Sequence, residues 1–303
     1  MSDDNHNDTI LCCASCGIAE IDDIKLKQCD SCDLVRYCSD ECQKEHKSQH
    51  EEACKKRAAE LRDKLLFKQP ESTHLGDCPI CCLPMPVGST CLTCFCNCCS
   101  QTICIGCDYE YQKQERGRRP SCAFCRQPLP KIDKEYRKQR MKRIEANDPA
   151  AMCQEGKKEQ HEKGNYRRAF EYYAKAAALG NVEAQCNLGY LYHVGQGVEK
   201  DRVKKMYYLE EAAIGGHPEA RYNLGCEEWS NGNAERAVKH WIIAVKQGYD
   251  KAVKQLMNVF KAGIFSKEDL AAALRAHQAA LDATKSPQRE LAHRMYSSRQ
   301  MKF

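Results

Sequence analysis

Alanine and glycine recur along the carboxy-terminal half of the chain in a pattern that predicts paired helices. A glycine follows five residues after Ala151, Ala184 and Ala220, and these alanines, continued by Ala252, stand 33, 36 and 32 residues apart. Alanine-rich stretches then end in glycine, which suits the C-cap of a helix. A period of this length predicts an all-α solenoid of stacked helix pairs over residues 148–282.

The amino-terminal half has a different character, because it is poor in leucine, isoleucine, valine and phenylalanine. It holds 20 of the 23 cysteines, all between Cys12 and Cys125. A small domain of that composition cannot bury a sizeable core and needs metal ions or disulfides to be stable. The fold class we predict is therefore multidomain, with two small metal-stabilised modules followed by an all-α helical-repeat solenoid.

Charge runs and helix breakers predict how the chain is divided. Residues before Pro70 are charged and predict a helical linker, and a basic run after the last cysteine pair predicts a linker helix. We expect the last residues, with Ser286–Pro287 and scattered arginines, to be loosely ordered. The predicted divisions are a disordered start 1–11, a first cysteine module 12–54, a helical linker 55–75, a second cysteine module 76–128, a basic linker helix 129–147, repeats 148–282 and a flexible tail 283–303.

The opening of the chain favours metal over disulfides. Met1–His6 is polar and acidic, without the apolar stretch of a secretory signal, and no run of 18 apolar residues occurs in the sequence. We expect an intracellular protein, cytoplasmic or nuclear, that is neither secreted nor bound to a membrane. Cysteines stay reduced in those compartments, so paired cysteines there are typical of metal sites.

Cysteines arrive in pairs in the first cysteine module, with spacings that suit zinc. Eight ligands, enough for two tetrahedral ions, come from Cys13 with Cys16, Cys29 with Cys32, Cys38 with Cys42, and His50 with Cys54. Two intervening residues allow a tight turn to bring both sulfurs to one ion. Strong helix formers predict a helix over 38–54. Cys12 is an alternative to Cys13 as the partner of Cys16, although the closer spacing fits better.

Leu26–Cys32, Tyr37–Gln43 and the His50–Cys54 pair resemble the MYND zinc finger, with all eight ligand positions filled. The resemblance implies interleaved ligation, with one ion held by Cys13, Cys16, Cys38 and Cys42 and the other by Cys29, Cys32, His50 and Cys54. It also implies docking of short proline-containing segments of partner proteins. Lys47 stands where the family often has tryptophan, which bears on peptide binding more than on metal binding. A purely structural finger is the alternative.

The second cysteine module contains four further pairs. Three have the two-residue spacing, Cys78 to Cys81, Cys104 to Cys107 and Cys122 to Cys125, and Cys99 pairs with either Cys98 or Cys96. Spacing does not decide between the last two, because Cys91 and Cys94 crowd the same loop; we favour Cys98. With eight ligands in each module, the sequence predicts about four zinc ions per chain.

This spacing resembles a RING finger in which cysteine replaces the usual histidine. The resemblance implies one ion held by Cys78, Cys81, Cys104 and Cys107 and another held by Cys98, Cys99, Cys122 and Cys125. RING ubiquitin ligases have an apolar residue inside the first pair and a basic residue after the last ligand, and Ile80 and Arg126 stand there. They would bind a ubiquitin-conjugating enzyme and position its thioester for attack. Ala123 stands where proline is common. The alternative is a core role for Ile80 and a solvated charge at Arg126.

Glu183–Tyr192 followed by Gly195–Asp201 resembles a Sel-one-like repeat, a relative of the tetratricopeptide helix pair. The third repeat lacks the Gly-x-Gly loop, and the fourth has Met257 in place of glycine, as expected of a cap. The family usually serves as an adaptor scaffold that binds proteins. We expect the repeat aromatics to pack inside the solenoid: Tyr166, Tyr172, Tyr173, Tyr207, Tyr208, Trp229 and Trp241. Cys153, Cys186 and Cys226 are expected to be core residues.

The order of the three modules resembles that of multidomain proteins that combine them, and it predicts a zinc-binding adaptor, with a RING-type ubiquitin ligase as the alternative. The sequence has no nucleotide-binding, metalloprotease or hydrolase motif. Nucleic-acid binding is a weaker hypothesis, based on a formal charge of +5 and seven basic residues within Lys131–Arg143. Zinc-bound cysteines are thiolates, so filled sites remove this positive balance. We expect a solvated linking helix or a nuclear-import patch instead.

Overall fold

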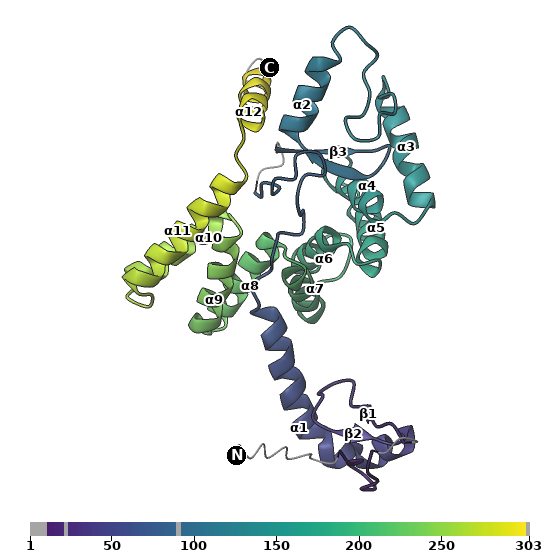
Figure 1. The fold of residues 1–303 in the computed structure, drawn as a ribbon, viewed down its shortest axis with the longest axis vertical. Coiled ribbons are helices and arrows are strands. Elements are labelled where there is room, and N and C mark those ends of the chain that lie inside the picture. Colours follow the sequence, from purple (N-terminus) through teal and green to yellow (C-terminus); the bar gives the residue numbers. More distant parts are fainter. Residues whose placement is uncertain (1–10, 21–23, 89–91, 301–303) are drawn as a thin grey trace, which may run out of the picture. The chain divides into compact units, whose positions relative to one another are not determined.

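The computed structural model describes residues 11–20, 24–88 and 92–300 (Figure 1). Most of the start that we expected to be disordered, and Cys91, lie outside the described residues. The contacts divide the chain into two compact units, Met1–Lys68 and Gln69–Phe303.

The first unit combines a small hairpin with one long helix. Strands β1 (Lys27–Gln28) and β2 (Arg36–Tyr37) pair antiparallel. Helix α1 (Asp40–Leu66) begins at Ser39, whose hydroxyl accepts a hydrogen bond from the Cys42 N–H at 3.2 Å, and acidic residues occupy its first turn. The helix expected over 38–54 thus continues into the predicted helical linker 55–75, but it ends at Leu66, so the last part of that linker is not helical. Its exposed surface is extensive, and the buried core of the unit consists mainly of cysteines with Leu26 and Tyr37.

The second unit begins with the second cysteine module. Strands β3 (Thr93–Cys96) and β4 (Gln101–Cys104) form an antiparallel hairpin that leads directly into helix α2 (Ile105–Gln114). Met85 and Ile103 are buried beside the cysteines, so this core too is small.

Helical pairs make up most of the second unit. After α3 (Asp133–Glu145) come α4 (Pro149–His161), α5 (Tyr166–Ala178), α6 (Val182–Val194), α7 (Arg202–Ile214), α8 (Pro218–Ser230), α9 (Ala234–Lys246), α10 (Asp250–Lys261) and α11 (Lys267–Ala283). Helix α4 packs on α5, α6 on α7 and α8 on α9, and each pair packs on the next. Side chains cap these helices at their first turns, as Asp148, Asn181 and Asp201 do.

The alanine and glycine positions of the sequence pattern lie in the core of this stack. Ala151, Ala184, Ala220 and Ala252 are completely buried. The glycine five residues later lies against a large side chain of the next helix: Gly156 against Tyr173, Gly189 against Leu209 and Gly225 against Trp241. Small residues on one helix therefore make room for large residues on its partner.

The prediction of a flexible tail is wrong for Pro287–Gln300, which form helix α12. Ser286 is its N-cap, because the Ser286 hydroxyl accepts a hydrogen bond from the Arg289 N–H at 3.2 Å. A serine followed by proline occurs at the start of helices as well as in loops. In this chain Ser286 and Pro287 begin a helix. Helix α12 packs along α2 of the second cysteine module, with Ala292 fully buried.

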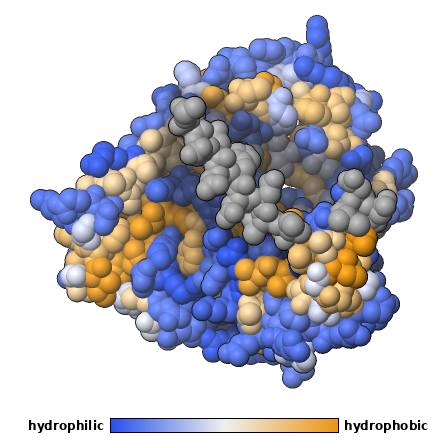
Figure 2. Space-filling view, turned by 60° about the horizontal axis from the view of Figure 1, so that its bottom comes forward, coloured by the Kyte–Doolittle hydropathy of each residue, from blue (hydrophilic) through white to orange (hydrophobic). Residues whose placement is uncertain are grey.

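Apolar side chains on the surface gather in separate areas among hydrophilic residues (Figure 2). Tyr173 and Trp241 are buried as expected, but Tyr207 and Trp229 are 55% and 40% exposed, so the prediction that they pack inside is wrong. Among the described residues, no helix is both long enough and apolar enough to cross a membrane.

Candidate metal centres

Four cysteine pairs with two-residue spacing share one backbone turn. In each, the residue after the second cysteine has a positive φ and donates its N–H to the carbonyl of the first cysteine. These residues are Gly17, Asp33, Cys82 and Arg126, with N to O distances of 2.9, 3.2, 2.8 and 2.9 Å. The turn directs both thiols of a pair to the same side, as a shared metal ion requires. Cys82 occupies the positive-φ position of one of these turns, and it belongs to none of the ligand clusters among the described residues.

The first unit holds two clusters of four ligands. Cys13, Cys16, Cys38 and Cys42 form one, and Cys29, Cys32, His50 and Cys54 form the other. Helix α1 supplies Cys42, His50 and Cys54, and Cys38 lies between β2 and this helix. The two backbone turns supply Cys13 with Cys16 and Cys29 with Cys32. The first cluster uses Cys13, whereas Cys12 is exposed and outside it.

The second cysteine module holds two further clusters. Cys78, Cys81, Cys104 and Cys107 form the third cluster, and Cys98, Cys99, Cys122 and Cys125 form the fourth. The pairs interleave along the chain in both modules, so each cluster brings together segments that are distant in the sequence.

Cys98 and Cys96 compete for the last position of the fourth cluster. The Cys98 thiol lies 3.3 Å from that of Cys125 and stands within the cluster. The backbone at Cys96 forms the same turn as in the four pairs above. The Cys96 carbonyl accepts a hydrogen bond from the Ser100 N–H at 2.7 Å, and Ser100 has a positive φ. The structure therefore places the Cys98 side chain in the cluster and leaves Cys96 and Cys94 beside it.

The chemistry of these clusters fits zinc. Sulfur to sulfur distances are 3.5 Å for Cys16 and Cys38, 3.9 Å for Cys78 and Cys107 and 3.8 Å for Cys81 and Cys104. A tetrahedral ion with bonds of about 2.3 Å would separate its sulfurs by about 3.8 Å. Thiolate and imidazole donors without carboxylates are the ligand set of structural zinc. The two clusters of the first unit and the two all-cysteine clusters of the second cysteine module thus fit zinc binding.

Hydrogen bonds from backbone N–H groups lower the pKa of some of the cluster thiols. Burial raises the pKa of Cys78, but backbone N–H groups, that of Cys104 first among them, lower it to about 7. Burial likewise raises the pKa of Cys122, and the N–H of Cys125 and its neighbours lower it to about 7. A lowered pKa makes the thiolate, the metal-binding form, available near neutral pH.

Ile80 and Arg126 both line a groove of about 290 Å³ on the second cysteine module. Ile80 is 42% exposed, so it is not a core residue. The Arg126 guanidinium lies 4.2 Å above the ring of Tyr111 on α2, a cation–π contact that fixes its position. Arg126 is therefore exposed to solvent and held over the Tyr111 ring at the same time.

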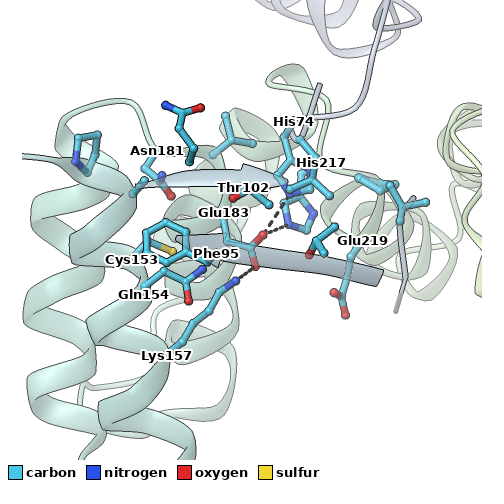
Figure 3. A pocket seen from close by; sticks show the side chains of 18 of the residues that line it. His74, Phe95, Thr102, Cys153, Gln154, Lys157, Asn181, Glu183, His217 and Glu219 are labelled. Atoms are coloured by element: carbon cyan, nitrogen blue, oxygen red, sulfur yellow. Dashed lines mark hydrogen bonds and ion pairs between the residues drawn. The ribbon is translucent and has the colours of Figure 1, made fainter. Parts of the chain in front are cut away.

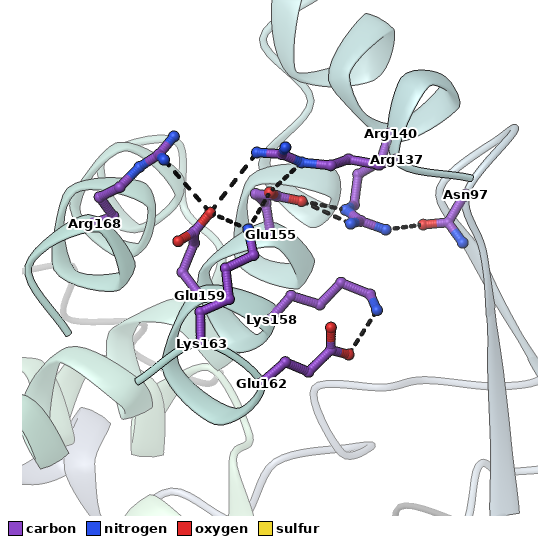
Figure 4. Close-up of polar contacts among 9 residues, drawn as sticks. All are labelled: Asn97, Arg137, Arg140, Glu155, Lys158, Glu159, Glu162, Lys163 and Arg168. Atoms are coloured by element: carbon purple, nitrogen blue, oxygen red, sulfur yellow. Dashed lines mark hydrogen bonds and ion pairs between the residues drawn. The ribbon is translucent and has the colours of Figure 1, made fainter. Parts of the chain in front are cut away.

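The basic linker helix α3 directs its arginines into the repeats (Figure 4). Arg140 is buried, and its guanidinium contacts the fully buried Glu155 at 2.7 Å and donates to the Asn97 side chain at 2.7 Å. Arg137 also pairs with Glu155, at 3.1 Å, and Arg143 pairs with Asp148 at 2.6 Å. Three of the seven basic side chains are thus neutralised within the chain, which weakens the nucleic-acid hypothesis.

Sequence reasoning missed a polar cluster where the second cysteine module meets the repeats. His74, Glu183 and His217 lie together in a cavity of about 770 Å³ (Figure 3). Glu183 accepts from His74 at 3.0 Å and pairs with Lys157 at 3.0 Å. The two imidazole rings stack 4.1 Å apart at 17°. A ring nitrogen binds metal in the plane of its ring, so two stacked rings cannot both aim at one ion. The cluster is a hydrogen-bonded charge network, and no local pattern marks it.

The folds and clusters define a protein with an N-terminal zinc-finger module and a helical-repeat solenoid. Residues 13–54 match the model of the MYND finger, and residues 150–181, 182–217 and 218–249 match that of the Sel1 repeat. The chain therefore carries a MYND zinc finger and Sel1 repeats. Both are generally protein-interaction modules, which indicates a protein-interaction scaffold.

Two solved structures are similar to part of this chain. A Sel1 repeat protein from Oxalobacter formigenes is 28% identical with a TM-score of 0.44, and the match covers 51% of this chain and 66% of that one. The protein c5321, a protective antigen present in uropathogenic Escherichia coli strains and displaying an SLR fold, is 22% identical with a TM-score of 0.40, over 62% of this chain and 39% of that one. The chain spans less than two thirds of either relative's length.

Proposed function

We propose that the protein is a zinc-dependent adaptor that holds partner proteins through its MYND finger and its repeats. The observation that carries the proposal is the set of four tetrad clusters, which interleave distant segments and so give each small module its shape. The proposal assigns about four zinc ions per chain, one to each cluster. Because the ligands are reduced cysteines, it also assigns the protein to the inside of the cell.

Exposed apolar side chains on the repeats and on the MYND finger support partner binding. On the repeats, Tyr190, Val203 and Tyr207 are 47%, 80% and 55% exposed. On the MYND finger, Ile18 and Leu34 are 45% and 53% exposed. Exposed aromatic and aliphatic side chains are common in protein-binding sites.

The experiment is a binding assay of proline-containing peptides against the full chain, read by fluorescence polarisation. We expect zinc-dependent binding that Cys32→Ser abolishes, because this change removes a ligand of the second cluster. The matched variant Cys78→Ser removes a ligand from the other module and should leave peptide binding intact. Binding that survives Cys32→Ser, or no binding by the wild type, would contradict the role of the finger.

A second candidate function is RING-type ubiquitin ligase activity of the second cysteine module. What supports it is the interleaved order of the third and fourth clusters together with the groove that Ile80 and Arg126 share. In this reading Ile80 contacts a ubiquitin-conjugating enzyme, and Arg126 positions the charged thioester without acting as a nucleophile. The repeats and the MYND finger would then select the substrate.

Autoubiquitination with a panel of conjugating enzymes tests this reading. We expect product that Arg126→Ala and Ile80→Ala reduce by about tenfold or more, because positioning is the contribution of the module. The exposed Arg118→Ala on the same module serves as the charge-matched control. Product that is absent, or equal in all these variants, would rule out the ligase.

A further inference from the structure

Arg289, in the first turn of α12, is a buried cation that the proposed function does not use. It is only 7% exposed. Its Nη1 donates to the Pro84 carbonyl at 2.6 Å and to that of Thr284 at 2.8 Å. Its Nη2 donates to the Leu83 carbonyl at 3.1 Å and to the Cys81 thiol sulfur at 3.4 Å. The guanidinium therefore lies inside the turn that carries two thiols of the third cluster.

A buried charge requires a compensating charge, because leaving water costs several kcal/mol per ion. Within the described residues, the Arg289 guanidinium donates to three carbonyl oxygens and the Cys81 sulfur and also interacts with the Cys104 thiol, and no carboxylate is among these partners. Its Nε is buried without a partner. Four thiolates around one Zn²⁺ carry two net negative charges, so a metal-filled third cluster supplies the missing charge.

The backbone contacts of α12 fit the same arrangement. Gly106, between two ligands of the third cluster, allows α12 to approach α2, since a Cβ there would lie 2.7 Å from the Arg289 backbone nitrogen. Further along, Tyr109 of α2 and Tyr296 of α12 meet edge to face, with ring centroids 6.2 Å apart. The helix is thus built to dock at this cluster.

We propose that Arg289 is the counter-charge of a metal–thiolate centre at Cys78, Cys81, Cys104 and Cys107, and that metal loading of this centre docks α12 onto the second cysteine module. The inference rests on the proposed zinc site. Docking also shapes the groove at Ile80 and Arg126, because Ser286 and Gln288 at the start of α12 line it as well.

The first test is hydrogen exchange of the full chain, read by mass spectrometry over residues 287–297. With zinc we expect this segment to be protected, and after chelation its exchange should rise about tenfold or more. Arg289→Met should show fast exchange even with zinc. Arg294→Met is the matched control, because Arg294 is exposed on the same helix and bonds only to its own helix backbone.

The second test is the rate at which zinc leaves the protein in excess chelator. Outer-shell partners of a metal site change its affinity by about 10- to 100-fold. Arg289→Met should therefore speed the release of one zinc ion per chain by about tenfold or more, whereas Arg289→Lys, which keeps the charge, should stay closer to wild type. If Cys104→Ser removes this kinetic phase of zinc release, the phase is assigned to the third cluster.

Gly106→Ala gives a test that leaves every charge and ligand in place. The added methyl group should displace the start of α12 and raise exchange over 287–297, with four zinc ions still bound. Slow zinc release and full protection in Arg289→Met would overturn the inference and leave the zinc site standing. A wild type that holds no zinc at the third cluster would overturn both.

Discussion

At the scale of single residues, the position of a thiol, and not the shape of the backbone, determines which cysteine completes the fourth cluster. Cys96 begins the same backbone turn as the four cysteine pairs with two-residue spacing, but it is the Cys98 sulfur that lies 3.3 Å from the Cys125 sulfur. Ligand spacing alone could not separate them, because both stand within a few residues of Cys99.

Serine replacements should separate the two thiols. Cys98→Ser should lower the zinc content of the purified chain by one ion, because the fourth cluster loses a ligand, whereas Cys96→Ser should keep about four ions. Metal analysis by atomic spectrometry gives both values. The reverse result would make Cys96 the ligand and would reassign the pair.

Glycine positions in the repeats carry a packing requirement of the same local kind. Gly225→Ala should destabilise the chain by about 1–3 kcal/mol, because the new Cβ would lie 2.4 Å from the Trp241 ring nitrogen. In a Trp241→Leu background the same change should cost less or even stabilise, since alanine is the better helix former by about 1 kcal/mol. Thermal unfolding of the four chains measures the coupling, and additive effects would contradict the contact.

At the scale of helices, α3 is an anchor between the second cysteine module and the first repeat. Burial raises the pKa of Glu155, but Arg140 and then Arg137 lower it below its ordinary value. Arg140 also donates to Asn97 of the module, so one side chain fixes three elements.

Arg140→Ala should therefore destabilise the second unit by about 3–5 kcal/mol, because it leaves a buried carboxylate with incomplete compensation. Lys138→Ala on the exposed side of α3 is the charge-matched control and should change stability by less than about 0.5 kcal/mol. Denaturant unfolding followed by circular dichroism compares the two variants. Equal effects would mean that α3 is a solvated linker after all.

How much of this could be read from the sequence depends on how local each signal is. The ligand pairs and the Ala184 to Gly189 spacing lie within one turn or one helix, so composition and period reveal them. His74 and Glu183 are 109 residues apart, and Arg289 and Cys81 are 208 residues apart. No short-range pattern encodes such contacts. Helix α12 was not predicted because, among its described side chains, only Arg289 and Ala292 are buried, and the groups that Arg289 contacts in the cysteine module lie about 200 residues earlier in the sequence.

At the scale of the second unit, the cysteine module and the repeats meet through charge as well as packing. Burial on its own raises the pKa of Glu183, but His217, whose Nε2 lies 3.7 Å from the carboxylate, the hydrogen bond from His74 and the charge of Lys157 lower that pKa well below its ordinary value. A carboxyl whose folded pKa is lowered contributes stability above its unfolded value, about 4.3, and loses it as the pH falls through the folded value.

Glu183→Gln should accordingly lower the thermal midpoint at neutral pH, and the difference from wild type should shrink as the pH falls below about 4. Glu219→Gln is the matched control, because Glu219 is half exposed and meets Lys251 only at 4.0 Å. Calorimetry across this pH range compares the three chains. A difference that does not depend on pH would mean that the Glu183 charge is not what joins the module to the repeats.

Zinc should stabilise the repeats, although the repeats contain none of the cluster ligands. Chelation should unfold the cysteine modules and leave the helical signal of the repeats at low temperature, because metal binding supplies the folding free energy of the modules. The thermal midpoint of the repeats should nevertheless fall, because Arg140 of α3 would lose its contact with Asn97 and α12 would lose its contact with α2 of the module. Cys104→Ser, which disrupts the module in the second unit, should lower that midpoint as chelation does. Cys32→Ser, in the separate first unit, should leave it unchanged; a midpoint that moves in both variants, or in neither, would contradict this coupling.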